Sequence, residues 1–251
     1  MSNDSNNVAL ITGGTGAIGI ALCRRFHAAG FSVVANCHPS DATRSEEALA
    51  ALRNEEGVRV ELAPFDETDP EAAAAAVADI ESRIGPIDAL VNAAGITRDA
   101  TLAKLEPDAW RAVLSTNLDG VYNVTRPVAT AMGERGYGRI VNVSSVNGQR
   151  GQIGQTNYSA AKAGMTGFTR ALAREVARDG VTVNSVSPGY VSSPMIEAIP
   201  EAIRAKVVKQ IPVGRFAEPD EIARTVLFLA DRDSGYITGS DVSVNGGFHI
   251  G

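Results

Sequence analysis

The sequence has few of the features that mark membrane, disulfide-rich or metal-binding proteins. No run of 18 apolar residues occurs, so we expect no transmembrane helix. Residues 1–7 are polar, so we expect no apolar signal segment there. The two cysteines, Cys23 and Cys37, lack disulfide-framework or metal-ligand spacing. A reducing, cytoplasmic location is therefore the prediction.

An excess of basic residues is also missing. The chain carries 29 acidic and 23 basic residues, with a net charge of -6 and a pI near 5.2. This balance argues against a nucleic acid or a membrane surface as partner, but not against a small anionic ligand held by local basic groups. No linker, charge block or low-complexity tract divides the 251 residues, so residues 1–251 are interpreted as one domain.

Apolar runs alternate with helical patterns along the chain. Strands are expected at 8–11, 31–35, 58–62, 89–92, 139–143, 181–186 and 241–244. Helices are expected at 20–29, 44–55, 70–84, 108–132 (bent near Gly120 or Pro127), 157–177, 195–210 and 219–229. This alternation predicts an α/β fold, a single doubly wound Rossmann-type domain whose parallel sheet has helices on both faces.

A glycine-rich turn follows the first predicted strand. Gly14-Thr-Gly16-Ala-Ile-Gly19 has the GxGxxG spacing and leads directly into a helix. Glycines let a backbone approach a pyrophosphate, and the helix N-terminus offers free N–H groups to that anion. The alternative is a tight strand–helix turn that binds nothing.

A tyrosine and a lysine share a predicted helix face. Tyr158 and Lys162 are four residues apart, so the ammonium lies beside the phenol and should lower its pKa. A tyrosine tuned in this way can act as a general acid or base. Ser145, just after the fifth strand, could hydrogen-bond the oxygen that Tyr158 protonates. Alone, the spacing could equally be an ordinary helix pair.

These candidate residues follow different strands. The glycine turn follows the first strand, Asp66 the third, Asn92 the fourth, Ser145 the fifth and Pro188 the sixth. Ligands of open parallel sheets bind outside the carboxyl ends of the strands, so these positions should converge on one site.

Several of these motifs in register resemble the short-chain dehydrogenase/reductase family over nearly the whole chain. They are Thr12-Gly-x-x-x-Ala-x-Gly19, Asn92-Ala-Ala-Gly95, Asn117, Ser145, Tyr158-x-x-x-Lys162 and Pro188-Gly189. The resemblance implies a seven-stranded Rossmann sheet, a nicotinamide cofactor and a homotetramer. It also implies that Tyr158 is the proton donor, that Ser145 holds the substrate oxygen, and that Lys162 lowers the Tyr158 pKa and binds the nicotinamide ribose.

The same resemblance assigns the cofactor site. Asn117 would anchor a water linking Lys162 to solvent, or simply pack its helix. Asp66 would accept from the adenine amino group, or be a helix N-cap or loop carboxylate. The cofactor-binding set is Gly13, Gly14, Thr15, Gly16, Ile18, Gly19, Asn36, His38, Arg44, Asp66, Asn92, Ala93, Ala94, Gly95, Tyr158, Lys162, Pro188 and Gly189.

The segment from Ser144 to Tyr158 looks like that of acetoacetyl-CoA reductases of polyhydroxybutyrate synthesis. This implies reduction of an acyl-CoA thioester, acetoacetyl-CoA, to (R)-3-hydroxybutanoyl-CoA. Residues matching that subgroup's acyl and pantetheine channel are Asp99, Lys104, Gln152, Gln155 and Tyr190, although Asp99 and Lys104 could belong to a solvated rim. The alternatives are a reductase of 3-oxoacyl groups on acyl carrier protein and a catalytically silent dinucleotide-binding subunit.

The residues after the second strand bear on whether the cofactor is NADPH or NADH. NAD binders of this fold place Asp or Glu there, whereas this chain has Asn36-Cys-His-Pro39. Arg44 and His38 are the nearby cations for a 2′-phosphate, and Asp41 adds a negative charge. NADP(H) is therefore the predicted cofactor, with NAD(H) as the alternative. The alternative for Arg44 is a surface residue at the N-terminus of its helix.

Overall fold

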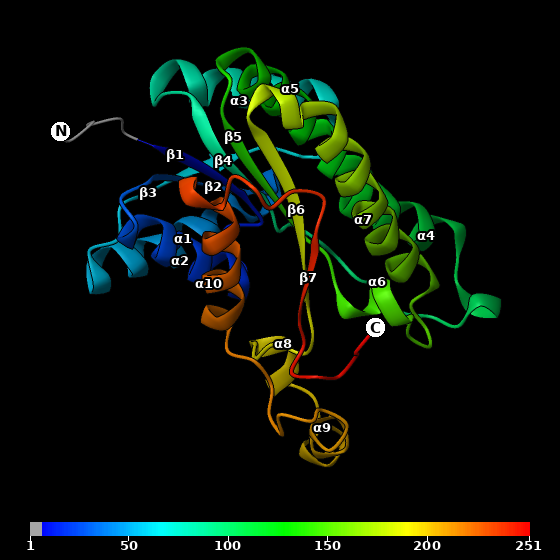
Figure 1. Ribbon diagram of the computed structural model, residues 1–251. Helices are drawn as coiled ribbons and strands as arrows, with labels where there is room; N and C mark the ends of the chain where they lie inside the picture. The colour runs from blue at the N-terminus through cyan, green and yellow to red at the C-terminus, as the bar shows by residue number, and fades with distance from the viewer. Residues whose placement is uncertain (1–6) are drawn as a thin grey trace.

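The computed structural model describes residues 7–251, which form a seven-stranded sheet in which every neighbouring pair is parallel. The strand order is β3-β2-β1-β4-β5-β6-β7, with helices on both faces (Figure 1). The predicted fold class is confirmed. The strands are β1 Val8–Thr12, β2 Ser32–Cys37, β3 Val60–Pro64, β4 Ile87–Asn92, β5 Gly138–Val143, β6 Val181–Pro188 and β7 Asp241–Val244.

Ten α-helices connect or extend these strands within the described residues. They are α1 Ala17–Ala28, α2 Ala42–Glu56, α3 Pro70–Arg83, α4 Pro107–Leu114, α5 Gly120–Arg135, α6 Val146–Arg150, α7 Thr156–Val176, α8 Pro194–Glu197, α9 Glu201–Val208 and α10 Pro219–Ala230. No helix in this part of the chain is both long and apolar enough to cross a bilayer.

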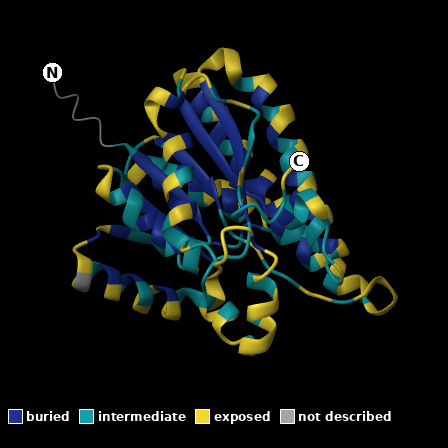
Figure 2. Cartoon of the chain, turned by 60° about the horizontal axis from the view of Figure 1, so that its bottom comes forward, coloured by how far each residue is buried: buried dark blue, intermediate teal, exposed yellow. Residues whose placement is uncertain are grey.

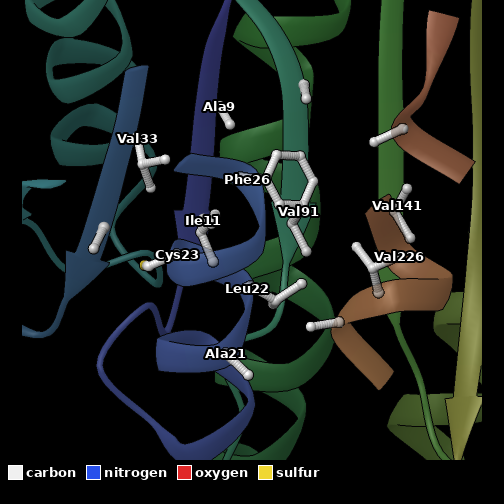
Figure 3. Packing of buried hydrophobic residues seen from close by; sticks show 14 of the residues in the cluster. Ala9, Ile11, Ala21, Leu22, Cys23, Phe26, Val33, Val91, Val141 and Val226 are labelled. Carbon is white, nitrogen blue, oxygen red and sulfur yellow. The ribbon is translucent and has the colours of Figure 1, made fainter. Parts of the chain in front are cut away.

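Alternate residues of the central strands serve two separate cores. In β1, Ala9 and Ile11 face the core made with α1, α2 and α10, where Phe26 and Val226 also lie (Figure 3). Leu10 faces the opposite core, made with α3, α5 and α7. Both faces of β1 are therefore fully buried, which explains why its sequence is a continuous apolar run.

Two predicted helices are divided in the structure. The expected helix 195–210 becomes α8 and α9, because Pro200 lies at the start of α9 and cannot continue α8. The expected helix 108–132 is α4 and α5 joined by a π-helical turn, Ser115–Asp119, while Pro127 lies inside α5. The irregularity therefore precedes Gly120.

Other boundaries also differ from the sequence prediction. The second strand runs to Cys37, so Asn36 belongs to the sheet and not to the following loop. The short helix α6 was not predicted; it begins after Ser145 and ends at Gly151, where φ is +75°. Beyond the carboxyl ends of the strands, α8 and α9 project from the body (Figure 1), and α9 is largely exposed (Figure 2).

Candidate active site

The turn between β1 and α1 is packed so tightly that three of its glycines admit no side chain. A Cβ at Gly13 would lie 2.7 Å from the Ala94 Cα, and one at Gly14 would lie 2.6 Å from the Ala35 Cβ. A Cβ at Gly19 would collide with the carbonyl oxygen of Gly13. These positions need glycine for the protein's own packing.

Gly16 differs from these three glycines. A Cβ there would have Gly13 O as its nearest neighbour at 3.5 Å, so its open side faces away from the body. Gly16 is also the N-cap of α1, and no side chain caps the helix. The first turn of α1 thus presents backbone N–H groups to an open edge, which fits the pyrophosphate of a dinucleotide.

Buried polar side chains hold this turn from behind. The carbonyl of Asn36 accepts from Gly14 N at 2.9 Å, and its Oδ1 accepts from Gly13 N at 3.4 Å. Its Nδ2 donates to the carbonyl of Phe65 at 2.9 Å. Asn36 is fully buried, so its side chain supports the turn from inside the fold rather than lining an open surface.

A second support links β1 to the segment after β4. The Thr12 hydroxyl oxygen accepts from the backbone N–H groups of Ala93 and Ala94 at 3.1 and 3.2 Å. Sequence reasoning included Thr12 in the glycine motif but not among the site residues. Asn92 points inward, where its Nδ2 donates to Asn142 Oδ1 at 2.8 Å.

The loop after β2 carries the cations expected at a 2′-phosphate. Arg44 is exposed over 81% of its side chain and forms an ion pair with Asp41, whose Oδ1 lies 3.4 Å from Nη2. His38 lies closer to the sheet, with Nδ1 2.7 Å from Ser40 Oγ and Nε2 3.6 Å from Asp66 Oδ2. Of the two cations, Arg44 is thus the more available to a ligand.

Asp66 lies in a turn and is not a helix cap. Its Oδ1 accepts from Thr68 N at 2.9 Å and from the Thr68 hydroxyl at 2.7 Å, whereas Asp69 caps α3. Burial works to raise the pKa of Asp66, but the hydrogen bonds from Thr68 and the nearby His38 prevail and lower it. Asp66 is therefore an ionised acceptor at neutral pH.

Ser145, Tyr158 and Lys162 meet where β5 ends. The Ser145 Oγ accepts from Asn147 N at 3.1 Å, capping α6, and the Ser145 side chain works to lower the pKa of Tyr158. The bond from Asn147 uses one lone pair of this oxygen, and the hydroxyl proton of Ser145 is a separate donor. Lys162 is buried, donates to the carbonyl of Val143 at 2.8 Å, and lies 5.8 Å from the Tyr158 ring centroid.

The electrostatics of this trio differ from the sequence prediction. Burial raises the pKa of Tyr158 above its ordinary value, Asp99 adds to this, and the Ser145 hydrogen bond opposes it. The expected lowering of the Tyr158 pKa by Lys162 is therefore wrong for this structure. Burial also lowers the pKa of Lys162 to about 8. The Tyr158 phenol thus stays protonated at neutral pH, as a proton donor requires.

Asn117 lies behind the trio, within the π-helical turn. Its Oδ1 accepts from Ile96 N at 2.8 Å and its Nδ2 donates to Ile96 O at 2.9 Å. The backbone of Gly95 passes beside both Asn117 and Lys162, since a Cβ there would be 3.3 Å from Asn117 Oδ1 and 3.6 Å from Lys162 Nζ. Asn117 therefore holds the segment after β4 against Lys162.

A cavity of about 470 Å³ opens where these elements meet. Ten of the 25 predicted site residues line it: Ile18, Ala93, Gly95, Ser145, Gln155, Tyr158, Lys162, Pro188, Gly189 and Tyr190. Tyr190 is held by edge-to-face packing on Phe248 at 5.4 Å between ring centroids. Of the strand-end residues expected to converge, Ser145 and Pro188 line this cavity, whereas Asp66 and Asn92 do not.

Some predicted residues lie outside this lining. Asp99, Lys104 and Gln152 do not line the cavity, and Lys104 is exposed in a short 3-10 helix, Leu102–Lys104. Conversely, sequence reasoning missed Asn147, which lines the cavity beside Ser145. Its position two residues after Ser145, at the start of an unpredicted helix, was the only signal for it.

Comparison with known proteins gives a consistent family. Residues 14–249 match a family model described as enoyl-(acyl carrier protein) reductase. The chain is 53% identical over 243 residues to an acetoacetyl-CoA reductase of Allochromatium vinosum, covering 97% of this chain and 98% of the relative. It is 50% identical to that of Shinella zoogloeoides, covering 96% and 98%.

A more distant relative has a related name. The 3-oxoacyl-(acyl-carrier-protein) reductase FabG of Haemophilus influenzae is 39% identical over 243 residues, covering 97% of this chain and 98% of the relative. With the glycine turn and the Ser145, Tyr158 and Lys162 cluster in place, the chain belongs to the short-chain dehydrogenase/reductase family and is an oxidoreductase that uses a nicotinamide dinucleotide.

Proposed function

We propose that this protein is an NADPH-dependent acetoacetyl-CoA reductase that forms (R)-3-hydroxybutanoyl-CoA for polyhydroxybutyrate synthesis. The observation that carries the proposal is the cavity in which Ser145, Tyr158 and Lys162 meet. Relatives that are 47–53% identical over nearly their whole length, and are named acetoacetyl-CoA reductases, support the choice of substrate.

The chemistry divides between the cofactor and the chain. A bound nicotinamide dinucleotide supplies the hydride for carbonyl reduction. Tyr158 gives its phenolic proton to the 3-keto oxygen, so that oxygen becomes the hydroxyl of the product. The Ser145 hydroxyl donates a second hydrogen bond to that oxygen and orients it. Lys162, buried beside Tyr158, would hold the nicotinamide ribose.

The chain's own groups also favour NADPH. β2 ends in Asn36 and Cys37, so no carboxylate at that strand end repels a 2′-phosphate. Arg44 is the exposed cation nearby, and Asp41 partly offsets it. The remaining glycine-turn and strand-end residues of the predicted cofactor set, Asp66 among them, would contact the rest of the dinucleotide.

The thioester arm would leave the cavity past Tyr190 and Gln155. Asp99, Lys104 and Gln152 stand outside the lining and would meet only the outer part of a long substrate. We therefore expect acetoacetyl-CoA to exceed free acetoacetate by orders of magnitude in kcat/KM, because an analogue without the arm lacks the binding energy of the arm's contacts outside the reacting centre.

The runner-up function is reduction of 3-oxoacyl groups on acyl carrier protein, which the 39% identical FabG supports. A carrier protein needs a basic docking patch. Arg150 is partly occupied, since its guanidinium stacks 4.3 Å from the Phe248 ring centroid, and Arg98 bonds to Thr97 O. A catalytically silent subunit is the third reading, disfavoured by the complete trio.

One assay panel tests these readings. Nicotinamide oxidation should be followed with acetoacetyl-CoA, acetoacetyl-carrier protein and acetoacetate, each with NADPH and with NADH. We expect the fastest turnover with the CoA thioester and NADPH. Faster turnover of the carrier-protein thioester would favour the runner-up function, and the absence of any turnover would favour the silent subunit.

We also propose that residues 1–251 act as one domain in a homotetramer and that this homotetramer is cytoplasmic. The free thiols of Cys23 and Cys37 support the cytoplasmic location.

A further inference from the structure

A chain of side-chain hydrogen bonds crosses the mouth of the cavity. Asn147 Nδ2 donates to Gln155 Oε1 at 2.9 Å, and Gln155 Nε2 donates to Asp99 Oδ2 at 2.9 Å. Both polar ends of Gln155 are therefore engaged by the protein itself. The residue that the family resemblance assigns to the substrate channel is used here to join two other side chains.

The chemistry of the three groups fixes the direction of this chain. An ionised carboxylate only accepts hydrogen bonds, so Gln155 must turn its NH₂ group toward Asp99. Its carbonyl oxygen then faces Asn147, which must in turn present its own NH₂ group. Asn147 Oδ1 is left buried without a partner, so among the described residues the bond to Gln155 is the only recorded anchor of that amide.

The bonds connect the two elements that carry the proton-transfer residues. Asn147 lies in α6, where its backbone N–H donates to Ser145 Oγ. Gln155 is the N-cap of α7, three residues before Tyr158. On the far side, Ala100 N donates to Gly154 O at 2.9 Å and brings the Asp99 segment against the same loop.

We propose that Asn147, Gln155 and Asp99 form an amide clamp that positions Ser145 against Tyr158, rather than acting primarily as contacts to the substrate. The clamp rests on the proposed function, because it concerns the geometry of that same proton-transfer site. Its three members are positioning residues: they act on the substrate oxygen only through Ser145 and Tyr158.

The test is a charge-matched rescue. Gln155→Glu places a carboxylate against Asp99, and like charges at hydrogen-bond distance repel. We expect kcat with acetoacetyl-CoA to fall at least about tenfold, with a smaller change in KM, the scale of coupling between contacting residues. Adding Asp99→Asn should return kcat to within about threefold, because the new amide can donate to the Glu while Asn147 still donates to its other oxygen.

The matched control is Gln152→Glu in the same loop, with and without Asp99→Asn. These variants carry the same charges, but Gln152 makes no recorded bond to Asp99, so Asp99→Asn should give no rescue. Full kcat in Gln155→Glu, or equal rescue in both pairs, would overturn the clamp and leave simple repulsion of the anionic substrate as the explanation.

The clamp and the proposed function can fail separately. If the native protein does not reduce acetoacetyl-CoA, the proposed function is wrong, and the clamp is judged from thermal midpoints of the same variants. Gln155→Glu should then lower the midpoint by about 2 °C or more, and Asp99→Asn should restore it only in that background. If Gln155→Glu does not fold, folding of the Asp99→Asn, Gln155→Glu double variant supports the clamp, and its failure to fold contradicts it.

Discussion

Lys162 lies one helical turn from Tyr158, and burial shifts the pKa of each. The i,i+4 spacing placed the two on one helix face, but the Lys162 ammonium bonds Val143 O at 2.8 Å and not the phenol. Since burial disfavours charge on both groups, the Tyr158 pKa rises and the Lys162 pKa falls. Without ligand, the pair favours a protonated phenol.

Tyr158→Phe keeps the ring and removes the proton that the substrate oxygen receives. We expect kcat to fall at least about 100-fold, the usual scale of general acid catalysis, while cofactor affinity survives. The measurements are steady-state kinetics and cofactor titration, with Tyr236→Phe, a fully exposed tyrosine, as the matched control. Near-normal turnover in a folded Tyr158→Phe protein would show that Tyr158 is not the general acid.

Burial of Lys162 makes the free energy of unfolding change with pH in the alkaline range. Its folded-state pKa of about 8 lies below its ordinary value of 10.5, so between these values the unfolded chain binds more protons. The contribution of Lys162 to the free energy of unfolding should therefore rise with pH across that window, by up to about 3 kcal/mol, whereas the Cys23 thiol, whose pKa burial raises from 9.0 to about 12, opposes it above pH 9. Lys162→Met should lack this rise when both proteins are unfolded with denaturant between pH 7 and 10.

The matched control for this pH dependence is Lys206→Met. Lys206 is exposed on α9, so its loss should leave the alkaline rise intact. Parallel stability curves for the native protein and Lys162→Met would contradict the assignment of the rise to Lys162.

Arg44 decides how strongly a 2′-phosphate is held, if the cofactor proposal is right. Arg44→Ala should weaken the binding of NADPH by roughly 1–3 kcal/mol, the scale of a hydrogen bond to a charged group, and leave the binding of NADH nearly unchanged. Asp41→Asn should strengthen the binding of NADPH, because it removes the carboxylate that lies 3.4 Å from the Arg44 guanidinium. Comparing kcat/KM for both cofactors checks this, and equal losses for NADPH and NADH would exclude the role.

At the scale of elements, two glycines of the β1–α1 turn have different roles, one in packing and one in the proposed binding of the dinucleotide. Gly19 touches the turn's own backbone, whereas Gly16 faces open space. We expect Gly19→Ala to lower the thermal midpoint by several degrees, because a Cβ there forces the turn apart. Gly16→Ala should fold with a near-native midpoint yet bind the dinucleotide at least about tenfold more weakly.

Calorimetric or fluorescence titration, together with thermal unfolding, checks both glycine variants. Unchanged cofactor affinity in Gly16→Ala would show that the pyrophosphate does not pass over this glycine. A native midpoint in Gly19→Ala would show that the turn can relax in a way that the packing does not indicate.

At the scale of the whole molecule, two separate faces expose large apolar side chains. Tyr122 on α5 borders a hollow of about 710 Å³ between α5 and α7, and Phe228 lies on α10, on the other side of the sheet (Figure 1). A tetramer with two kinds of two-fold interface needs two such faces. The two faces therefore suit the proposed homotetramer of 26.2 kDa chains.

Single substitutions on these faces should dissociate the tetramer stepwise. Tyr122→Glu and Phe228→Glu should each give dimers, and the double variant monomers, because a buried unpaired charge opposes each interface. Light scattering coupled to size-exclusion chromatography measures the mass, with Ile203→Glu on α9 as the control. A monomeric native protein, or tetramers in all variants, would contradict the assignment.

The sequence by itself determined the architecture and the place where three proposed catalytic residues meet, because both depend on the order of strands and helices along the chain. Alternation of apolar runs specified the parallel sheet, and the positions of Ser145, Tyr158 and Lys162 relative to the strands specified where they meet. Strand and helix boundaries were less accurate, since Pro200 and the π-helical turn act through backbone geometry that composition does not record.

Only the tertiary structure decided which way the polar side chains point and what burial does to them. Asn36 was predicted at the cofactor but is bonded from behind to Phe65, a contact 29 residues away in the chain. Gln155 was predicted at the substrate but bonds to Asp99, 56 residues away. Such contacts, and the desolvation that reverses the expected pKa of Tyr158, arise only when distant segments pack together.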